Sequence, residues 1–300
     1  MLLVTGSIGI DTLETPHGRV ENVLGGSAVH FALAACHFVE VRIVAAVGED
    51  FDPRLLDPLR GQRIDVRGIE VRCGSKTFRW HGRYAGAMNE AETVAVQLNV
   101  LAERGAPVPP EFLDSRFVFL ANTHPALQGE LARQLHRAAL LVCDTMNLWI
   151  ENESQELRRT LGRVHGLVVN EGEARLLTGQ ANLVTAGREI LKMGPRFVII
   201  KKGEHGSLLV FGDDLCVMPA YPTEKVVDPT GCGDSFAGAA MGYLAAQGRW
   251  DARTLRAAMA RGSVVASFVI ESFGVEASAR ITLADIEQRL AQLAELSRFD

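Results

Sequence analysis

The chain has 300 residues, 47% of them hydrophobic, and its 31 basic and 36 acidic side chains give a formal net charge of −5. This composition is typical of a globular protein, and a mildly acidic chain without blocks of like charge is poorly suited to neutralise nucleic-acid phosphates or anionic lipid. We therefore expect a small-molecule substrate, with neither nucleic acid nor a membrane as partner. Five scattered cysteines form no zinc or redox motif, and the first residues carry no basic targeting segment, so we expect a reduced, cytoplasmic protein.

Short apolar runs alternate with helical patterns along most of the chain. The alternation predicts an α/β fold in which helices cover a parallel sheet. Ligands of such sheets bind at the carboxyl ends of the strands, so chemistry is expected in the loops that follow strands. The predicted strands are 2–10, 41–47, 117–121, 140–143, 166–169 and 197–201, and the predicted helices are 26–37, 53–60, 126–139, 154–161, 171–177 and 182–193.

The stretch from about residue 64 to residue 98 breaks this alternation, because strand-like runs are separated there by Gly and Asn. We expect residues 64–98 to form a small β-sheet lid on an α/β core of residues 1–63 and 99–300. Further lid strands could come from the region around 11–24.

One predicted lid strand has two unlike faces. Phe78, Trp80 and Tyr84 share one face, and the other face is largely basic. The pattern fits side chains packed under a sheet, and it also fits a lid that closes over a ligand and excludes water.

The segment Val226–Phe236 is the most informative part of the sequence. We predict a short strand, then a turn with Gly231 and Gly233, then a helix of about residues 234–246. Amides at a helix N-terminus lack partners and attract anions, and glycine lets the backbone approach a phosphate closely. An acid at Asp234 could take the proton of an attacking hydroxyl. The same residues also fit an ordinary helix cap.

Three competing motifs fail on the same segment. The chain has no Walker-type phosphate loop, and Phe236 stands where a dinucleotide fingerprint needs its third glycine. A serine hydrolase built on Ser235 in the order Ser, Asp, His needs a later histidine, and the last histidine is His205.

Four motifs resemble those of the ribokinase-like, or PfkB, family of carbohydrate kinases. Asp228-Pro-Thr-Gly-Cys-Gly-Asp234 is similar to the family's Asp-Thr-Gly-Ala-Gly-Asp signature, and Gly25-Gly-Ser-Ala-Val-His-Phe-Ala32 to its N-terminal Gly-Gly and helix. Asn170-Glu-Gly-Glu173 and Lys202-Gly-Glu-His-Gly206 resemble two later elements. The resemblance implies a three-layer α/β/α core with a β-sheet lid, and ATP-dependent phosphorylation of an alcohol.

The resemblance also implies roles for individual residues. Asp234 would be the general base, and the amides of Gly231, Cys232 and Gly233 would stabilise the transferring phosphoryl group. Cys232 replaces the family's alanine, and its thiol could make the enzyme sensitive to alkylation. The implied substrate-binding residues are Asp11, Gly25, Gly26 and His30; the implied ATP-binding residues are Lys201, Gly203, Gly206 and Thr230; and Asn170 and Glu173 are implied in binding Mg²⁺ through water.

Each of these assignments has a structural alternative. Asn170 with Glu173 is also a capping-box pattern, and Asp11 could simply form a turn. The glycines after Lys201 fit a plain hairpin. His30 stands where the family often has Asn, which leaves the substrate open, and the roles of Asn122, His124 and Asn147 are also open.

We expect an ATP- and Mg²⁺-dependent kinase that phosphorylates a primary hydroxyl of a small sugar or polyol. The alternative is a nucleoside kinase of the same family, because Gly-Gly-Ser-Ala resembles that branch and an aromatic lid residue could stack on a base. A non-catalytic ligand-binding protein is the remote alternative. A monovalent cation near Asp228 and a homodimer formed through the lid are further possibilities that the resemblance raises.

Overall fold

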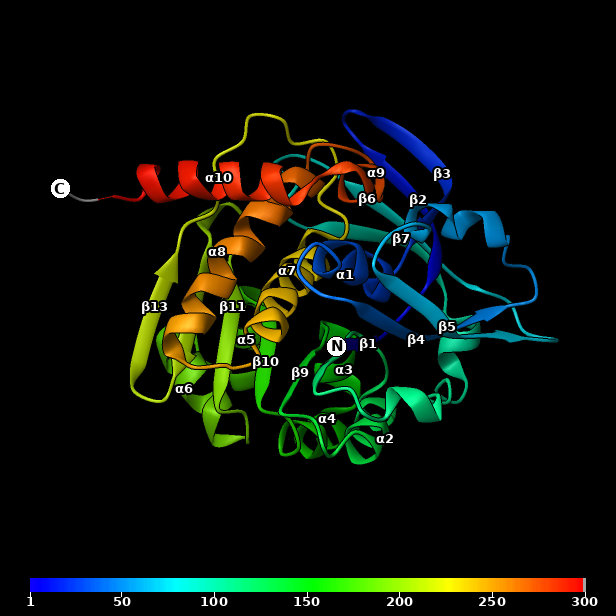
Figure 1. Ribbon diagram of the computed structural model, residues 1–300, viewed down its shortest axis with the longest axis horizontal. Helices are drawn as coiled ribbons and strands as arrows, with labels where there is room; N and C mark the ends of the chain where they lie inside the picture. The colour runs from blue at the N-terminus through cyan, green and yellow to red at the C-terminus, as the bar shows by residue number, and fades with distance from the viewer. Residues whose placement is uncertain (299–300) are drawn as a thin grey trace.

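A nine-stranded sheet runs through the computed structural model, which describes residues 1–298 (Figure 1). The strand order is β13-β12-β11-β10-β9-β8-β1-β4-β5, and the strands from β11 to β5 are parallel. β12 and β13 extend the sheet antiparallel at one edge. The strands are β1 Leu2–Thr5, β4 Val41–Gly48, β5 Ile64–Arg72, β8 Phe117–Leu120, β9 Leu140–Asp144, β10 Gly166–Asn170, β11 Phe197–Lys201, β12 Ser207–Phe211 and β13 Asp214–Met218.

Helices cover both faces of this sheet, because its central strands are apolar on both sides. Phe31, Phe119 and Phe236 belong to the core beneath one helical layer, and Leu120, Leu157 and Ile190 to the core beneath the other. The first layer is α1 Ser27–Ala35, α7 Cys232–Gln247 and α8 Ala252–Val269; the second is α2 Pro125–Gln134, α4 Ser154–Leu161, α5 Glu171–Thr178 and α6 Leu183–Lys192. α10 Leu283–Leu296 packs on α8, and α3 Asn147–Asn152 and α9 Glu276–Arg280 are short. The expected three-layer α/β/α fold is confirmed.

A second, four-stranded sheet forms the lid, in the order β3-β2-β6-β7. Its strands are β2 Gly9–Thr15, β3 Gly18–Gly25, β6 Phe78–Tyr84 and β7 Ala91–Gln97. Two lid strands therefore come from the region before α1, which the sequence only suggested. The expectation that residues 64–72 belong to the lid is wrong, because β5 pairs in parallel with β4 at the edge of the large sheet. An edge strand is half-exposed and so lacks the continuous apolar run that marks a buried parallel strand.

Three predicted boundaries also differ from the structure. The predicted strand 2–10 is divided between the two sheets, since β1 ends at Thr5 and β2 begins at Gly9. Residues Pro53–Leu59 form a 3-10 helix around two prolines. No strand precedes the turn at Gly231: the amides of Val227 and Asp228 both donate to the carbonyl of Ile270, and no ladder partner is available there within residues 1–298.

Close packing of α1 against α7 places the first turn of α7. A Cβ added at Gly238 would lie 2.2 Å from the carbonyl oxygen of Phe31, and one added at Gly242 would lie 2.8 Å from that of Ala35. Small residues thus let the two backbones approach, and α1 and α7 are held as one unit.

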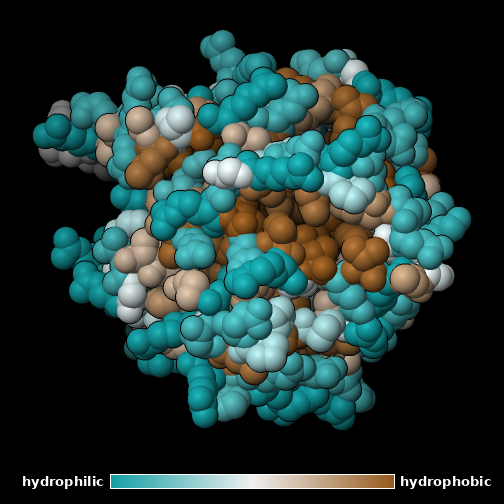
Figure 2. Space-filling model, turned by 45° about the vertical axis from the view of Figure 1, so that its right-hand side comes forward, coloured by the Kyte–Doolittle hydropathy of each residue, from teal (hydrophilic) through white to brown (hydrophobic). Residues whose placement is uncertain are grey.

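Hydrophilic residues dominate the surface, with hydrophobic residues gathered near the middle of the face in Figure 2. None of the helices within residues 1–298 combines the length and the apolar character needed to traverse a bilayer.

Gly238→Ala tests the α1–α7 contact. The added methyl group must push two backbones apart, so we expect the free energy of unfolding to fall by about 1–3 kcal/mol, as for other overpacked cores. Gly162→Ala is the control, because its Cβ would meet its nearest neighbour at an ordinary 3.6 Å. Urea unfolding followed by circular dichroism measures both, and equal stability of the two variants would contradict the packing argument.

Candidate active site

The turn before α7 presents free backbone amides. Gly231 is the N-cap of α7 with φ 74°, a left-handed conformation that glycine adopts without strain. Within residues 1–298, no hydrogen bond engages the amides of Gly231, Gly233 or Asp234, whereas the Cys232 amide donates to the carbonyl of Pro229 at 3.2 Å. The expected set of three amides therefore needs correction: Cys232 is already bonded, and the helix begins two residues earlier than predicted, which adds the amide of Asp234.

Asp234 lies at this helix start beside Lys201. Burial raises the pKa of the Asp234 carboxyl, and the positive charge of Lys201 opposes the increase. The Lys201 ammonium lies 2.6 Å from the position that a Cβ at Gly233 would take, so the lysine reaches the first turn of α7. The structure thus brings together Lys201, Gly233 and Asp234, which the sequence placed in separate motifs.

Asp144, at the end of β9, is a buried acid that the sequence reasoning missed. Its side chain is 7% exposed and its Oδ1 has no hydrogen-bond partner among the described residues. Burial raises its pKa most, the charge of Asp234 raises it further, and Lys201 lowers it. Its place at the carboxyl end of a parallel strand was the signal that could have found it.

Asp11 and the two glycines before α1 form a second part of the site. A Cβ at Gly25 would lie 1.8 Å from Oδ2 of Asp11, so only glycine fits beside the carboxylate. Gly26 has φ 103°, and a Cβ there would lie 2.4 Å from the Ser7 carbonyl oxygen. Asp11 is 4% exposed, and burial, together with the charges of Asp228 and Asp234, raises its pKa to about 7.

His30 packs its ring against the turn before α7. Its ring atoms lie 2.2–2.4 Å from the position of a Cβ at Gly231, so this contact and the positive φ both require glycine. His30 is 1% exposed, its two ring nitrogens have no partner within residues 1–298, and burial lowers its pKa to about 4. A neutral imidazole with two free nitrogens is therefore available beside the turn.

Asn170 and Glu173 form the capping box at the start of α5. Oδ1 of Asn170 accepts from the Glu173 amide at 2.7 Å, and Oε2 of Glu173 accepts from the Asn170 amide at 2.8 Å. Burial raises the pKa of Glu173, and Lys201 lowers it. Within residues 1–298, no three His, Cys, Asp or Glu side chains converge to hold a metal ion directly. The arrangement is compatible with a hydrated Mg²⁺ held by few protein ligands.

The remaining expected residues lie in two turns beside Lys201. Gly203 and Gly206 have φ 53° and 80°, and a Cβ at Gly206 would lie 2.1 Å from the Met218 carbonyl. Thr230 donates its amide to Oδ1 of Asp228 at 2.9 Å, and Oδ2 of Asp228 accepts from the Gly274 amide at 2.9 Å. Asp228 thus holds two loops together.

The surroundings of the Cys232 thiol do not support the expected sensitivity to alkylation. Burial raises its pKa, as do the charges of Asp228 and Asp234. The thiolate, which is the reactive form, is therefore disfavoured.

The aromatic face of β6 belongs to this site. Trp80 is directly opposite Asp11 in the parallel pair β2–β6, so both side chains lie on the same face of the lid. The indole lies flat across Gly82, where a Cβ would be 2.1 Å from the ring, and Nε1 donates to Oγ1 of Thr93 at 3.2 Å. The hydroxyl of Tyr84, on that same face, meets Oγ1 of Thr230 at 3.3 Å. The aromatic face is therefore turned toward the turn before α7.

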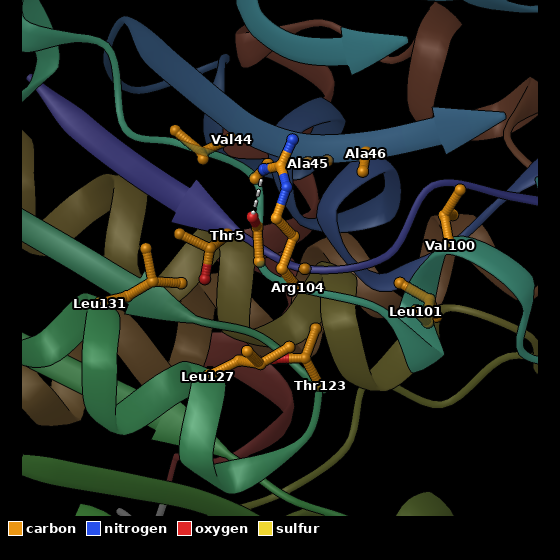
Figure 3. A pocket seen from close by; sticks show the side chains of 13 residues that line it. Thr5, Val44, Ala45, Ala46, Val100, Leu101, Arg104, Thr123, Leu127 and Leu131 are labelled. Carbon is orange, nitrogen blue, oxygen red and sulfur yellow. Dashed lines mark hydrogen bonds between the residues drawn. The ribbon is translucent and has the colours of Figure 1, made fainter. Parts of the chain in front are cut away.

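Of the other residues whose role the sequence left open, Asn122 and His124 have structural partners. Asn122 accepts from Nε1 of Trp149 at 2.9 Å, His124 caps α2 through the Ala126 amide, and Asn147 is exposed at the start of α3. A pocket of about 40 Å³ lies nearby, between the ends of β1 and β4 and α2 (Figure 3). Neither Asp11 nor Asp234 lines it, and it is too small for a nucleotide.

The pH dependence of stability tests the burial of Asp11. The folded protein keeps the Asp11 proton up to about pH 7, whereas the unfolded chain releases it near 3.8. The protonated Asp11 side chain therefore makes its full contribution to the free energy of unfolding at low pH, and this contribution is lost as the pH rises through about 7. The free energy of unfolding of Asp11→Asn, relative to that of wild type, should rise by at least about 1 kcal/mol as the pH goes from about 5 to about 8. Urea unfolding at a series of pH values measures this difference. Asp213→Asn, at an exposed acid, is the control; a pH-independent difference for Asp11→Asn would refute the assignment.

Comparison with known proteins places this geometry in a family. The sequence matches the domain described as pfkB family carbohydrate kinase over residues 2–282. It is 32% identical over 255 residues to a cytidine kinase of Thermococcus kodakarensis, covering 83% of this chain and 88% of the relative. It is 27% identical over 286 residues to a nucleoside kinase of Methanothermobacter thermautotrophicus, covering 91% and 87%.

Solved structures agree on the fold. A Burkholderia thailandensis nucleoside kinase in complex with inosine has a TM-score of 0.79 at 21% identity, with 98% of each chain covered. An aminoimidazole riboside kinase from Salmonella enterica, complexed with aminoimidazole riboside and an ATP analogue, has a TM-score of 0.77 at 18% identity, with 96% of this chain and 99% of that chain covered. Since the family domain spans nearly the whole sequence and the cytidine kinase is 32% identical over most of both chains, this protein belongs to the pfkB family of carbohydrate kinases and is an ATP-dependent kinase.

Proposed function

We propose that this kinase phosphorylates the primary hydroxyl of a nucleoside, with cytidine as the first candidate. The observation that carries the substrate class is Trp80, which stands directly opposite Asp11 on the lid face turned toward Asp234. A ribose held by Asp11 would place its attached base against this aromatic face. The two relatives named cytidine kinase and nucleoside kinase support this alternative over the free sugar or polyol that we expected first.

Asp234 is the proposed general base. Its burial raises the pKa above that of an ordinary carboxyl, which brings it closer to the working pH, where a base is most effective. Lys201 limits this increase and keeps the group able to ionise. The carboxylate takes the hydroxyl proton as the hydroxyl oxygen attacks the γ-phosphorus of ATP, the bond from that phosphorus to the bridging oxygen breaks, and ADP leaves.

The free amides of Gly231, Gly233 and Asp234 are the proposed anion hole. They stand at the positive end of the α7 dipole, where developing negative charge on the transferring phosphoryl oxygens is stabilised. Lys201 adds a positive charge at the same place. Gly203, Gly206 and Thr230 are proposed to approach the rest of the nucleotide.

The acceptor would be held by Asp11 and His30. The carboxylate of Asp11 accepts hydrogen bonds from two neighbouring ribose hydroxyls, and Gly25 and Gly26 let the sugar reach the backbone. The neutral imidazole of His30, with both nitrogens free among the described residues, offers one donor and one acceptor.

We propose that Mg²⁺ is bound through water molecules, and not directly, by the acidic side chains of Asp144 and Glu173. Glu173 and the unpartnered oxygen of Asp144 supply hard oxygen acceptors for the ion's hydration shell, and Asn170 fixes Glu173 through the capping box. The ion, when bound, would neutralise charge on the ATP phosphates.

A homodimer formed through the lid also remains a proposal. β7 is an edge strand whose residues are exposed throughout, with Val94 40% and Val96 50% exposed. An edge of this kind can pair with a second copy of the chain.

Removing the base tests the mechanism. Asp234→Asn should lower kcat by at least about 100-fold, because general-base help is lost, while the Kd for ATP stays within about twofold. Steady-state kinetics and calorimetric titration of ATP measure the two quantities. Near-normal turnover in the variant would remove Asp234 from the mechanism.

A substrate panel tests the proposed class. With ATP and Mg²⁺ present, we expect cytidine or another nucleoside to be phosphorylated with a kcat/KM at least about 10-fold above that of ribose, fructose or inositol. Trp80→Ala should lower kcat/KM for the nucleoside by about 10-fold and leave any activity on ribose nearly unchanged, because only the nucleoside has a base to stack. Faster turnover of a free sugar, or an equal loss on both substrates, would return the assignment to a sugar kinase.

A further inference from the structure

The lid is anchored to the core at one residue near the start of β6. Thr77 is fully buried, and its hydroxyl accepts from the Gly48 amide at 3.0 Å and donates to Oδ1 of Asp50 at 2.8 Å. Nδ2 of Asn99, just after β7, donates to the Thr77 carbonyl at 2.8 Å. The chain segments that enter and leave the β6–β7 hairpin are therefore hydrogen-bonded to each other at Thr77.

The far end of the same hairpin touches the phosphoryl-binding turn. Tyr84, the last residue of β6, is 9% exposed, and its hydroxyl accepts from Oγ1 of Thr230 at 3.3 Å. Thr230 is the residue before Gly231, and its amide is already fixed by Asp228. The Tyr84 contact is thus made one residue before Gly231, where the proposed anion hole begins.

The loop that follows Tyr84 touches a second turn of the core. Nδ2 of Asn89 meets Oε1 of Glu204 at 3.4 Å, in the turn that contains Gly203. Between them, Met88 is 6% exposed and has φ 58°, a conformation that costs an ordinary residue about 1 kcal/mol or more. A buried apolar side chain on a strained loop fits a segment that is held in place by docking on the core.

We propose that residues Tyr84–Asn89, the lid tip, form a latch that seats both core turns when the lid closes, with Tyr84 as a positioning residue for Thr230 and Gly231. Because β6 carries Trp80 over the acceptor and Tyr84 against the phosphoryl-binding turn, closure over the acceptor and alignment of the turn become one event. The inference rests on the kinase activity of the family and not on the nucleoside as substrate.

Tyr84→Phe tests the latch, because the ring remains and only the hydroxyl is lost. A net hydrogen bond of this kind corresponds to a change of about 3- to 10-fold in rate. We expect kcat to fall by that factor with the KM for ATP nearly unchanged. We also expect the ratio of ADP formed to acceptor phosphorylated to rise above one, because water enters the site and hydrolyses ATP. The acceptor is cytidine, or ribose if the panel identifies a sugar kinase. Tyr221→Phe is the control, because Tyr221 donates to Gln292 on the surface.

A double-mutant cycle with Thr230→Val separates positioning from general loss of packing. We expect the Tyr84→Phe effect on kcat and on the ADP ratio to disappear in the Thr230→Val background, because the two hydroxyls act through one contact. An undiminished effect in that background, an equal effect from Tyr221→Phe, or an unchanged kcat with one ADP per product would each overturn the latch. These outcomes do not depend on which acceptor the enzyme prefers, so they are distinct from failure of the proposed function.

Discussion

The first turn of α7 must hold free amides and a carboxylate in the same small space. The amides of Gly231 and Gly233 attract negative charge, whereas Asp234 supplies it, and the α1–α7 packing leaves neither group room to move away. Two things reconcile them: Lys201 balances the charge of Asp234, and burial raises the pKa of that carboxyl. In the proposed reaction, the phosphoryl group is bound by the amides and the attacking hydroxyl by the acid. The arrangement is suited to transfer between the two.

The same constraint explains the other acids around the turn. Asp11, Asp144 and Glu173 each have a raised pKa caused mainly by burial, and Asp234 raises each of them further. Such a cluster destabilises the empty protein as the pH rises, because the folded state holds protons that the unfolded chain releases. Proteins retain groups of this kind at functional sites, where substrate hydroxyls or hydrated cations satisfy them. These buried acids thus lower the stability of the folded protein, and they lie where we propose that the ligands bind.

Much of this fold could be predicted from the sequence because buried parallel strands are marked by short apolar runs, and the family resemblance pointed to Asp234, Gly231 and Asp11 as site residues. β5 was assigned to the wrong sheet because an edge strand lacks the continuous apolar signal, and the start of α7 was misplaced because the bond from Cys232 to Pro229 is a matter of turn geometry. Asp144 could have been found from its place at the end of a parallel strand, but its closeness to Asp234, like the contact between Tyr84 and Thr230, depends on tertiary proximity between distant segments. No local pattern records such proximity.

The most direct measurement is a crystal structure of the protein with ADP, Mg²⁺, aluminium fluoride and cytidine, which together imitate the phosphoryl group in transfer. The account predicts that the fluoride atoms lie within hydrogen-bonding distance of the amides of Gly231 and Gly233, and that the primary hydroxyl of the nucleoside points at Asp234. A complex in which the fluoride atoms contact neither amide, or in which Asp234 faces away from the acceptor, would contradict it.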